Sequence, residues 1–393
     1  MKKTAAVVVI GAGINGCSIA YNLAKDGVRN VLLVEKGYVA SGPTGRSSGI
    51  VRQHYTIETL AKMARDSLRT YRSFEEEVGG DAGFVQAGVV FLCSEQNAET
   101  LKKSVAMHQR LGIRESVLSP QELREMEPSL NVEDIGYGAY EPDGGYADPA
   151  LAANSLCIAA QREGVEVLLG TRVTGLRVQE AQIRGVITDK GEIATETVVN
   201  VAGPWGREIA AMVGVEIPIK PSRHPVVILK RPPQWRTPTP VWADLVNGWY
   251  FKPEGHDGML VGSISSEEAD QEADVEKYSV ATDYDEAATY SDGVLRRFPV
   301  MAEGLVKGGW AGLYDVTPDW QPVIDEIPEV KGFYCAVGFS GHGFKLGPAV
   351  GRIVSELVRD GKCSSYDTSV FRYRRFHNGQ LRAGDYDEYK ILG

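Results

Sequence analysis

The sequence predicts an α/β fold with a parallel sheet, joined to an α+β part that is built on a mostly antiparallel sheet. Residues 7–34 run from a buried strand through a glycine-rich turn and a helix into a second strand, as a parallel βαβ unit does. Two further glycine-rich turns, near positions 203 and 338, also follow apolar strands and precede helices. Residues 215–310 are instead rich in strands and punctuated by prolines, which favours the second sheet.

The first βαβ unit carries the features of a dinucleotide-binding site. Its strand, Val7–Ile10, leads into Gly11-Ala12-Gly13-Ile14-Asn15-Gly16, and its second strand, Val31–Val34, ends on Glu35. The first glycine permits a tight turn, the second lets the backbone approach a pyrophosphate, and the third lets helix and strand approach closely. The helix N-terminus offers free N–H groups to phosphates, and Glu35 can accept a hydrogen bond from a ribose hydroxyl. The glycines alone are a weak signal, but the strand, helix and acid together indicate a Rossmann-like site.

The remaining elements follow from periodicity and from turn and cap signals. Residues 37–49 form a loop rich in glycine and hydroxyl groups, which is either a plain linker or a ligand contact at the sheet edge. Ser119-Pro120-Gln121-Glu122 is a capping box that starts a short helix. The other expected helices cover 17–25, 56–78, 95–111, 148–164, 285–298 and 349–358. The expected strands after the βαβ unit include 88–93, 137–140, 165–169, 172–176, 183–188 and 197–201.

Composition and charge exclude several functional classes. The net charge of −10 argues against a broad phosphate-binding surface, so nucleic acid is not expected as a partner. The five cysteines are scattered and form no C-x-x-C pair, and His224 and His256 lack partners at ligand spacing, so we expect no metal. No apolar run is long enough to span a membrane, and the apolar residues after Met1 lead into the first strand rather than to a signal-peptide cleavage site. We therefore expect a cytoplasmic protein.

The three glycine-rich turns also predict how the chain is divided. Strand ends in an open α/β sheet meet at one edge, so a single ligand could contact all three turns. This predicts a discontinuous cofactor-binding domain of residues 1–85, 146–214 and 311–393. A substrate-binding domain of residues 86–145 and 215–310 would interrupt it twice.

The order of motifs along nearly the whole chain resembles one enzyme family. The motifs are G-A-G-I-N-G-C at 11–17, G-R-S-S-G at 45–49, A-G-P-W at 202–205 and G-F-S-G-H-G-F-K at 338–345. Together they resemble the FAD-dependent D-amino-acid oxidase, glycine oxidase and sarcosine oxidase family, especially the sarcosine oxidase β-subunit and monomeric branches. The resemblance implies a FAD-dependent oxidoreductase that oxidises the C–N bond of an amino acid or an N-substituted amino acid, such as sarcosine, glycine or an imino acid. Hydride would pass to flavin N5, and the imine would then hydrolyse.

The resemblance also implies which residues hold the cofactor. The glycine turn would hold the FAD pyrophosphate, Glu35 the ribose and Val173 the adenine, whereas residues 341–345 would contact the flavin ring. A helix N-terminus with a cation there would stabilise the charge of reduced flavin. The implied cofactor-binding residues are Gly11, Gly13, Ile14, Asn15, Gly16, Glu35, Lys36, Thr44, Arg46, Ser47, Ser48, Val173, Ala202, Gly203, Trp205, Gly341, His342, Gly343, Phe344 and Lys345.

The same resemblance assigns the substrate end of the site. Arg52 would grip the substrate carboxylate with Lys345 as its partner, since a planar guanidinium suits bidentate capture of a carboxylate. His54 and Tyr250 are further candidates for lining the substrate site. The cysteine that binds flavin covalently in the monomeric branch is replaced by Gly312, so FAD should be non-covalent. The lysine linked to oxygen activation falls near Leu260, which leaves O2 or another electron acceptor open.

Three alternatives remain open from the sequence. The first is a FAD enzyme that oxidises a hydroxy acid or a glycerol phosphate, which clustered cations in the substrate domain would favour. The second is an NAD-dependent dehydrogenase, which the βαβ unit alone would allow. The third is a flavin-holding β-type subunit without turnover of its own, and the sequence does not tell whether the chain is an oligomer.

Overall fold

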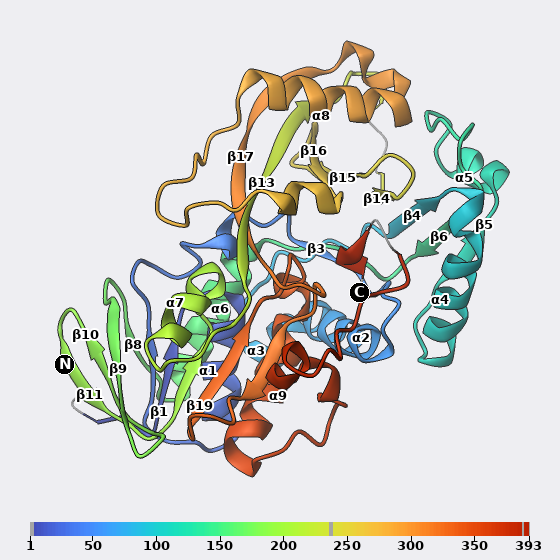
Figure 1. Ribbon diagram of the computed structural model, residues 1–393. Helices are drawn as coiled ribbons and strands as arrows, with labels where there is room; N and C mark the ends of the chain where they lie inside the picture. The colour runs from blue at the N-terminus through green and yellow to red at the C-terminus, as the bar shows by residue number, and fades with distance from the viewer. Residues whose placement is uncertain (1–3, 236–238, 387–388, 393) are drawn as a thin grey trace.

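The computed structural model describes residues 4–235, 239–386 and 389–392, and one half of it is built on a six-stranded, mostly parallel sheet (Figure 1). Two of its central strands, Val7–Ile10 and Val31–Val34, are short runs of Val, Ile and Leu with no polar member, as expected where both faces of a sheet are covered. Only the edge pair, β18 (Val323–Glu326) with β19 (Phe333–Val337), is antiparallel. The strand order is β18 (Val323–Glu326), β19 (Phe333–Val337), β12 (Val198–Asn200), β1 (Val7–Ile10), β2 (Val31–Val34) and β8 (Glu166–Leu168).

An eight-stranded sheet forms the second half of the molecule and lies above the first in Figure 1. Its pairs are antiparallel except for β4 (Val89–Cys93) with β14 (Val241–Asp244), so the expected mostly antiparallel sheet is confirmed. The order is β17 (Leu305–Val316), β13 (Lys220–Lys230), β16 (Gly258–Ser263), β15 (Trp249–Glu254), β14 (Val241–Asp244), β4 (Val89–Cys93), β6 (Tyr137–Glu141) and β5 (Ser116–Leu118).

Two smaller sheets and nine α-helices complete the described part of the chain. The small sheets are β9 (Val173–Gln179), β10 (Gln182–Thr188) and β11 (Gly191–Ala194), and the pair β3 (Ile50–Val51) with β7 (Gly145–Tyr146). The helices are α1 (Ile14–Lys25), α2 (Glu58–Arg72), α3 (Phe74–Val78), α4 (Ala98–Arg110), α5 (Pro120–Met126), α6 (Pro149–Arg162), α7 (Gly206–Ala211), α8 (Tyr284–Arg297) and α9 (Gly343–Asp360).

The six-stranded sheet separates two apolar cores. Val7 and Val9 of β1 point into a core shared with α1, α2, α6 and α9. Val8 and Ile10 point to the opposite face, where β9, β10 and α7 cover the sheet. This alternation places the helix-covered and strand-covered faces on opposite sides of one sheet, as the period of two in a strand requires.

Two helices differ most from the sequence prediction. The expected helix at 56–78 is divided at Ser73 into α2 and α3. The Ser73 hydroxyl donates hydrogen bonds to the carbonyl oxygen of Arg69 and to the carboxylate of Glu77. The helix expected from residue 349 begins at Gly343, with Pro348 in its second turn. Pro348 has no N–H for the carbonyl of Phe344, and the Tyr71 hydroxyl donates to that oxygen instead, at 2.7 Å.

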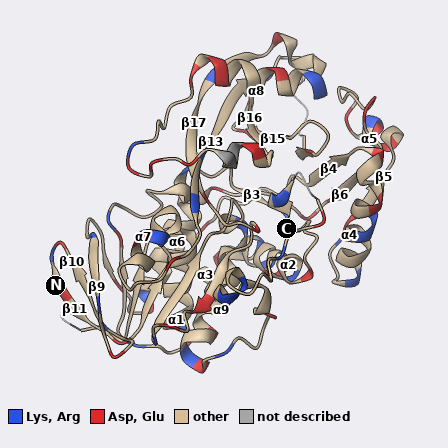
Figure 2. Ribbon diagram, in the orientation of Figure 1, with Lys and Arg blue, Asp and Glu red and all other residues tan. Residues whose placement is uncertain are grey.

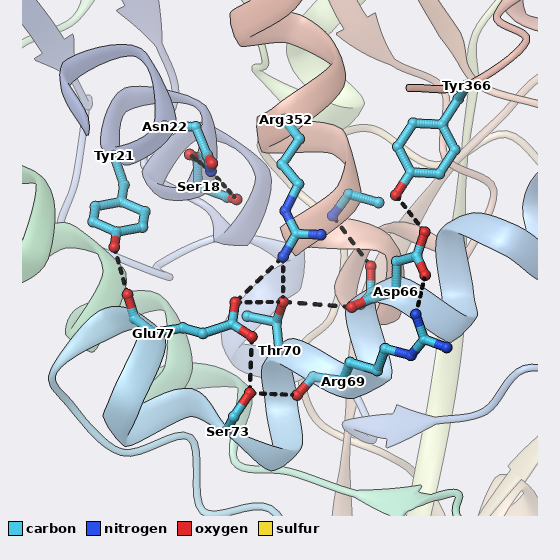
Figure 3. A network of polar contacts seen from close by, with 12 residues as sticks. Ser18, Tyr21, Asn22, Asp66, Arg69, Thr70, Ser73, Glu77, Arg352 and Tyr366 are labelled. Atoms are coloured by element: carbon cyan, nitrogen blue, oxygen red, sulfur yellow. Dashed lines mark hydrogen bonds and ion pairs between the residues drawn. The ribbon is translucent and has the colours of Figure 1, made fainter. Parts of the chain in front are cut away.

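A polar network fastens α9 to α2 and α3 (Figure 3). Arg352 of α9 donates to Thr70 Oγ1 at 2.7 Å and to Glu77 Oε2 at 3.3 Å. Tyr366, beyond α9, donates to Asp66 Oδ2 at 3.0 Å, and Tyr21 of α1 donates to the carbonyl oxygen of Glu77 at 2.6 Å. These contacts join α1, α2 and α3 with the distant α9 region of the chain and fix the orientation of α9, whose N-terminus faces the cavity described below.

The strands of the two large sheets alternate along the chain. The six-stranded sheet takes its strands from residues 7–34, 166–200 and 323–337, and the eight-stranded sheet from 89–141 and 220–316. The predicted boundary at residue 311 falls inside β17, which runs without interruption from Leu305 to Val316. The division into two domains itself stays a prediction.

Acidic and basic residues are intermixed on the outer helices. In Figure 2, α4, α5 and α8 each carry both signs of charge. Within the described ranges, no helix is both long enough and apolar enough to cross a bilayer.

Candidate cofactor and substrate site

One cavity of about 510 Å³ is lined by residues of both large sheets. At one end it is lined by Ile10 and Val34, which close the strands β1 and β2, and by Val201 after β12. At the other end it is lined by Val89 and Val241 of the eight-stranded sheet. A ligand that fills the cavity therefore contacts the carboxyl edge of the parallel sheet and one face of the antiparallel sheet.

The first glycine turn is shaped for close approach. Gly11 has φ of +113°, and a Cβ atom there would lie 2.6 Å from the carbonyl oxygen of Val201. A Cβ on Gly16 would lie 1.8 Å from the carbonyl oxygen of Gly11, so no other residue fits between α1 and the turn. Helix α1 has no side-chain cap at Gly13, and its N-terminus faces the cavity. This is the geometry in which backbone N–H groups hold a phosphate.

The Glu35 carboxylate lies at the end of β2, beside the turn. Its Oε2 accepts from the N–H of Ala12 at 2.9 Å and its Oε1 from the N–H of Gly37 at 2.7 Å. The loop 40–48 closes over the turn, since Thr44 Oγ1 accepts from the N–H of Ile14 at 3.1 Å. This loop is therefore part of the cavity and not a free linker.

The cavity brings together all but two of the residues that the sequence assigned to the site. Those that line it are Gly11, Gly13, Ile14, Asn15, Gly16, Glu35, Lys36, Thr44, Arg46, Ser47, Ser48, Arg52, Val173, Ala202, Gly203, Trp205, Tyr250, Gly341, Gly343, Phe344 and Lys345. His54 and His342 are the two exceptions. The His342 ring is fully buried beside Tyr55, whose hydroxyl lies 3.2 Å from its Nδ1.

The expectation that His54 lines the substrate site is wrong for this geometry. Its ring is fully buried and stacks on Phe91 at 4.4 Å between centroids. Nδ1 lies 2.7 Å from Glu115 Oε1 and Nε2 lies 3.1 Å from the Tyr386 hydroxyl. Because both ring nitrogens already have partners behind the cavity wall, the ring is drawn away from the substrate side.

Arg52 and Lys345 place two cations at the junction of the sheets. Arg52 donates to the carbonyl oxygens of His54 and Ile391, and its guanidinium lies 4.2 Å from the centroid of the Tyr55 ring. Lys345 Nζ donates to the carbonyl oxygen of Gly341 at 3.3 Å. Both residues are buried, and among the described residues neither forms an ion pair with a carboxylate.

The electrostatics of this pair favour an anionic ligand. Burial, and then the charge of Arg52, hold the pKa of Lys345 well below its usual range. The same two causes, burial and nearby cations, also lower the pKa of His342. A carboxylate placed between Arg52 and Lys345 would offset both the desolvation of Lys345 and its repulsion by Arg52, since opposite charges stabilise each other in a site of low dielectric.

A buried acid–histidine cluster behind Arg52 was not found from the sequence. The Glu115 carboxylate bridges the Nδ1 atoms of His54 and His108, and His108 Nε2 lies 2.7 Å from the carbonyl oxygen of Tyr55. Burial opposes its charge, but the two histidines lower the pKa of Glu115 to about 2. Burial, and then the charge of Glu115, raise the pKa of Glu141 to about 7.

This cluster holds the backbone that presents Arg52. Glu141 accepts hydrogen bonds from the N–H groups of Gln53 and His54, at 2.8 and 3.2 Å. His54, His108 and Glu115 are also the one set of described residues whose ligand atoms are close enough to hold a metal ion. Their atoms are engaged with one another, and the expectation of no metal stays a prediction.

The substrate end of the cavity is mainly apolar. Phe91, Ala243 and Ile264 join Val89 and Val241 in lining it. The ring of Tyr250 also lines this end of the cavity. A Cβ atom on Gly262 would lie 2.2 Å from that ring, so the tyrosine fits only because residue 262 is a glycine. His224 and Tyr314 form a further wall, with their rings stacked at 3.7 Å.

The residues present fit FAD. Asn15 Oδ1 is buried at the cavity and has no hydrogen-bond partner within the described part of the structure, as expected of a group that binds a ligand. The glycine turn fits a pyrophosphate, Glu35 a ribose, and the N-terminus of α9 with Lys345 fits an electron-rich ring edge. A glycine turn that fits a pyrophosphate, an acid that fits a ribose and a second sheet lining the same cavity are together typical of a dinucleotide-dependent oxidoreductase with a separate substrate wall.

Comparison with known proteins confirms this class. The chain belongs to the FAD dependent oxidoreductase family, whose model matches residues 6–357, and FAD is its cofactor. It is similar to mitochondrial sarcosine dehydrogenase of Mus musculus, with 30% identity over 388 residues, covering 96% of this chain and 42% of the relative. The chain therefore spans less than half the length of that curated relative.

Two solved structures have the same fold. One is the L-proline dehydrogenase from P. horikoshii, with 32% identity, a TM-score of 0.89 and coverage of 97% of this chain and 100% of the other. The other is the glycine oxidase from Geobacillus kaustophilus, with 25% identity, a TM-score of 0.82 and coverage of 95% and 99%. The predicted family and the α/β fold class are confirmed.

Proposed function

We propose that this chain oxidises the C–N bond of an amino acid or an N-substituted amino acid and passes the electrons to O2 or another acceptor. The observation that carries the proposal is the pair of buried cations, Arg52 and Lys345, at the junction of the cofactor and substrate ends. A substrate carboxylate is the ligand that this pair fits. The relatives support it, since their names include sarcosine, L-proline and glycine as substrates.

The residues at the cation pair would orient the substrate. Arg52 would bind the carboxylate through guanidinium N–H groups that its contacts to His54 and Ile391 leave available, and Lys345 would bind it from the first turn of α9. Bound FAD supplies the acceptor for the hydride that leaves the substrate carbon. The fixed carboxylate holds that carbon at one place in the cavity, which is how positioning lowers the barrier.

The walls favour a secondary or tertiary amine. Val89, Phe91 and Ile264 give the substrate end an apolar lining that suits an N-methyl group or a ring. An apolar wall also favours the neutral form of an amine, which is the form that can lose hydride. The imine product would then hydrolyse in water.

The proposed cofactor contacts follow the cavity. We propose that the turn at 11–16 holds the pyrophosphate, that Glu35 and Val173 hold the adenosine, and that residues 341–345 contact the flavin ring. Gly312 lines the cavity at the place where the monomeric branch has its cysteine, which supports non-covalent binding.

Replacement of Arg52 tests the carboxylate clamp. We expect Arg52→Ala to lower kcat/KM for N-methyl or cyclic amino acids by about 10²-fold or more, because the variant lacks the guanidinium that binds the substrate carboxylate. FAD content, measured by absorbance, should stay unchanged. Arg52→Lys should recover only part of the activity, because a lysine cannot bind both carboxylate oxygens with one planar group.

Arg177→Ala is the matched control, because Arg177 lies on the small sheet with an exposed partner, Glu192, and does not line the cavity. Its turnover should equal that of the unmodified enzyme. If Arg52→Ala turns over these substrates normally, the clamp is wrong. Flavin bleaching by hydroxy acids or glycerol phosphate, and not by amino acids, would instead favour the alternative substrate class.

A further inference from the structure

A connecting segment of the eight-stranded sheet lines the cavity near the edge of the six-stranded sheet. Residues 271–280, called the strap below, lie between β16 and α8 and contain neither helix nor strand. Val275, Glu276, Tyr278 and Val280 of the strap line the cavity, and Val275 is buried. The strap is therefore part of the cavity wall, although it belongs to the opposite sheet.

The Glu276 carboxylate joins the strap to the parallel sheet. Its Oε1 accepts from Lys36 Nζ at 2.9 Å, from Trp205 Nε1 at 2.9 Å and from Arg172 Nη1 at 3.2 Å. Lys36 also lies 3.5 Å from the centroid of the Trp205 ring. The hydrogen bond from Lys36, the largest cause, and those from the other two donors lower the pKa of Glu276 to about 2.

The three donors come from different parts of one edge. Lys36 follows β2, Arg172 precedes β9 and Trp205 follows β12. All three line the cavity. One carboxylate from the strap therefore bridges three segments that converge on the cofactor end.

The strap is fastened firmly at its two ends and weakly in the middle. The N–H of Ala273 donates to the carbonyl oxygen of Pro221 in β13 at 2.8 Å, and the carbonyl oxygen of Val280 accepts from Ala311 in β17 at 2.7 Å. The side chains of Glu276 and Arg172 are 47% and 50% exposed, and that of Lys36 is 28% exposed. Ion pairs with this exposure are weak and are screened by salt, so the middle can open while the ends stay attached.

We propose that the strap is a latch over the adenosine half of the FAD site, and that the contacts of Glu276 must break before FAD enters or leaves. The adenosine half is indicated because Lys36 follows Glu35 and Arg172 precedes Val173, the residues proposed for ribose and adenine. The latch concerns retention of the family's cofactor, so it does not depend on which substrate is oxidised.

The test is the rate at which FAD leaves the purified holoenzyme. FAD fluorescence is followed after dilution to nanomolar concentration, since bound flavin is usually quenched. We expect Glu276→Gln to release FAD about fivefold faster, the range for a small network of exposed ion pairs. Trp205→Phe, which keeps the ring but removes the indole N–H, should have a smaller effect in the same direction.

The salt dependence of FAD release and a matched control variant distinguish a latch from a general destabilisation of the protein. Added NaCl should speed release from the unmodified enzyme and have little effect on Glu276→Gln, because the screened contacts are already lost. Glu192→Gln is the control, since Glu192 has an exposed fraction of 45% against 47% for Glu276 and pairs with one arginine away from the cavity. Equal or slower FAD release from Glu276→Gln, or the same acceleration in Glu192→Gln, would overturn the proposal.

Discussion

At the scale of single residues, burying Arg52 and Lys345 close together is electrostatically unfavourable for the folded protein. Two cations in a buried place repel each other, and the free protein reduces this cost through the low pKa of Lys345. The charged groups that act on Lys345 are led by Arg52, and Lys345 in turn acts on His342. Carboxylate binding should therefore be linked to protonation of Lys345.

This linkage predicts proton uptake on ligand binding. A bound carboxylate raises the pKa of Lys345, so at a pH between the free and bound pKa values binding should take up as much as about one proton. Affinity should be full below the free pKa and should fall as the pH rises through the bound pKa. Calorimetric titration of pyrrole-2-carboxylate in buffers of different ionisation enthalpy measures the uptake, and the matching amide, which lacks the charge, is the control. Equal heats in all buffers would contradict the linkage.

The site residues that could be predicted from the sequence are those that lie within a contiguous sequence motif. Gly11, Gly16 and Arg52 belong to short contiguous patterns, so their place in the cavity could be predicted. Glu115 and Glu276 could not, because His54 lies 61 positions from Glu115 and Lys36 lies 240 positions from Glu276 along the chain. Only the fold brings these pairs together, and neither carboxylate stands in a recognisable motif.

At the scale of elements, the start of α9 was hidden by Pro348. A proline usually marks a helix boundary, which is why the sequence favoured a start at residue 349. In the structure the helix continues through it, because the carbonyl oxygen of Phe344 receives a hydrogen bond from Tyr71 of α2. This contact from another element is what allows the N-terminus of α9 to reach the cavity.

A double-mutant cycle tests the exchange of hydrogen bonds at Pro348. Tyr71→Phe should destabilise the protein by about 1 kcal/mol or more, because it leaves a buried carbonyl oxygen without its donor. In a Pro348→Ala background the same change should cost clearly less, since the new N–H of residue 348 can donate to Phe344. Urea unfolding of the four proteins measures the difference. Equal costs in both backgrounds would show that the hydroxyl does not replace the missing helical bond.

At the scale of the whole molecule, one cavity depends on both large sheets. The six-stranded sheet supplies the glycine turn and Glu35, and the eight-stranded sheet supplies Tyr250 and, through the strap, Glu276. The alternation of segments along the chain made two sheets predictable. The way they meet was not, because it depends on side chains such as Val275 that match no pattern.

A ligand that spans both sheets should stabilise more than either of its halves. FAD present at 100 times its dissociation constant should add about 2.7 kcal/mol to the free energy of unfolding, and the melting temperature should rise accordingly. FMN carries the flavin without the adenosine, and ADP carries the adenosine without the flavin, so each contacts one end of the cavity and should stabilise less at equal concentration. Thermal unfolding of the apoprotein with each ligand, followed by circular dichroism, measures the three shifts. If FMN stabilises the protein as much as FAD does, the glycine turn and Glu35 contribute nothing to binding, and the assignment of that end to adenosine and pyrophosphate is wrong.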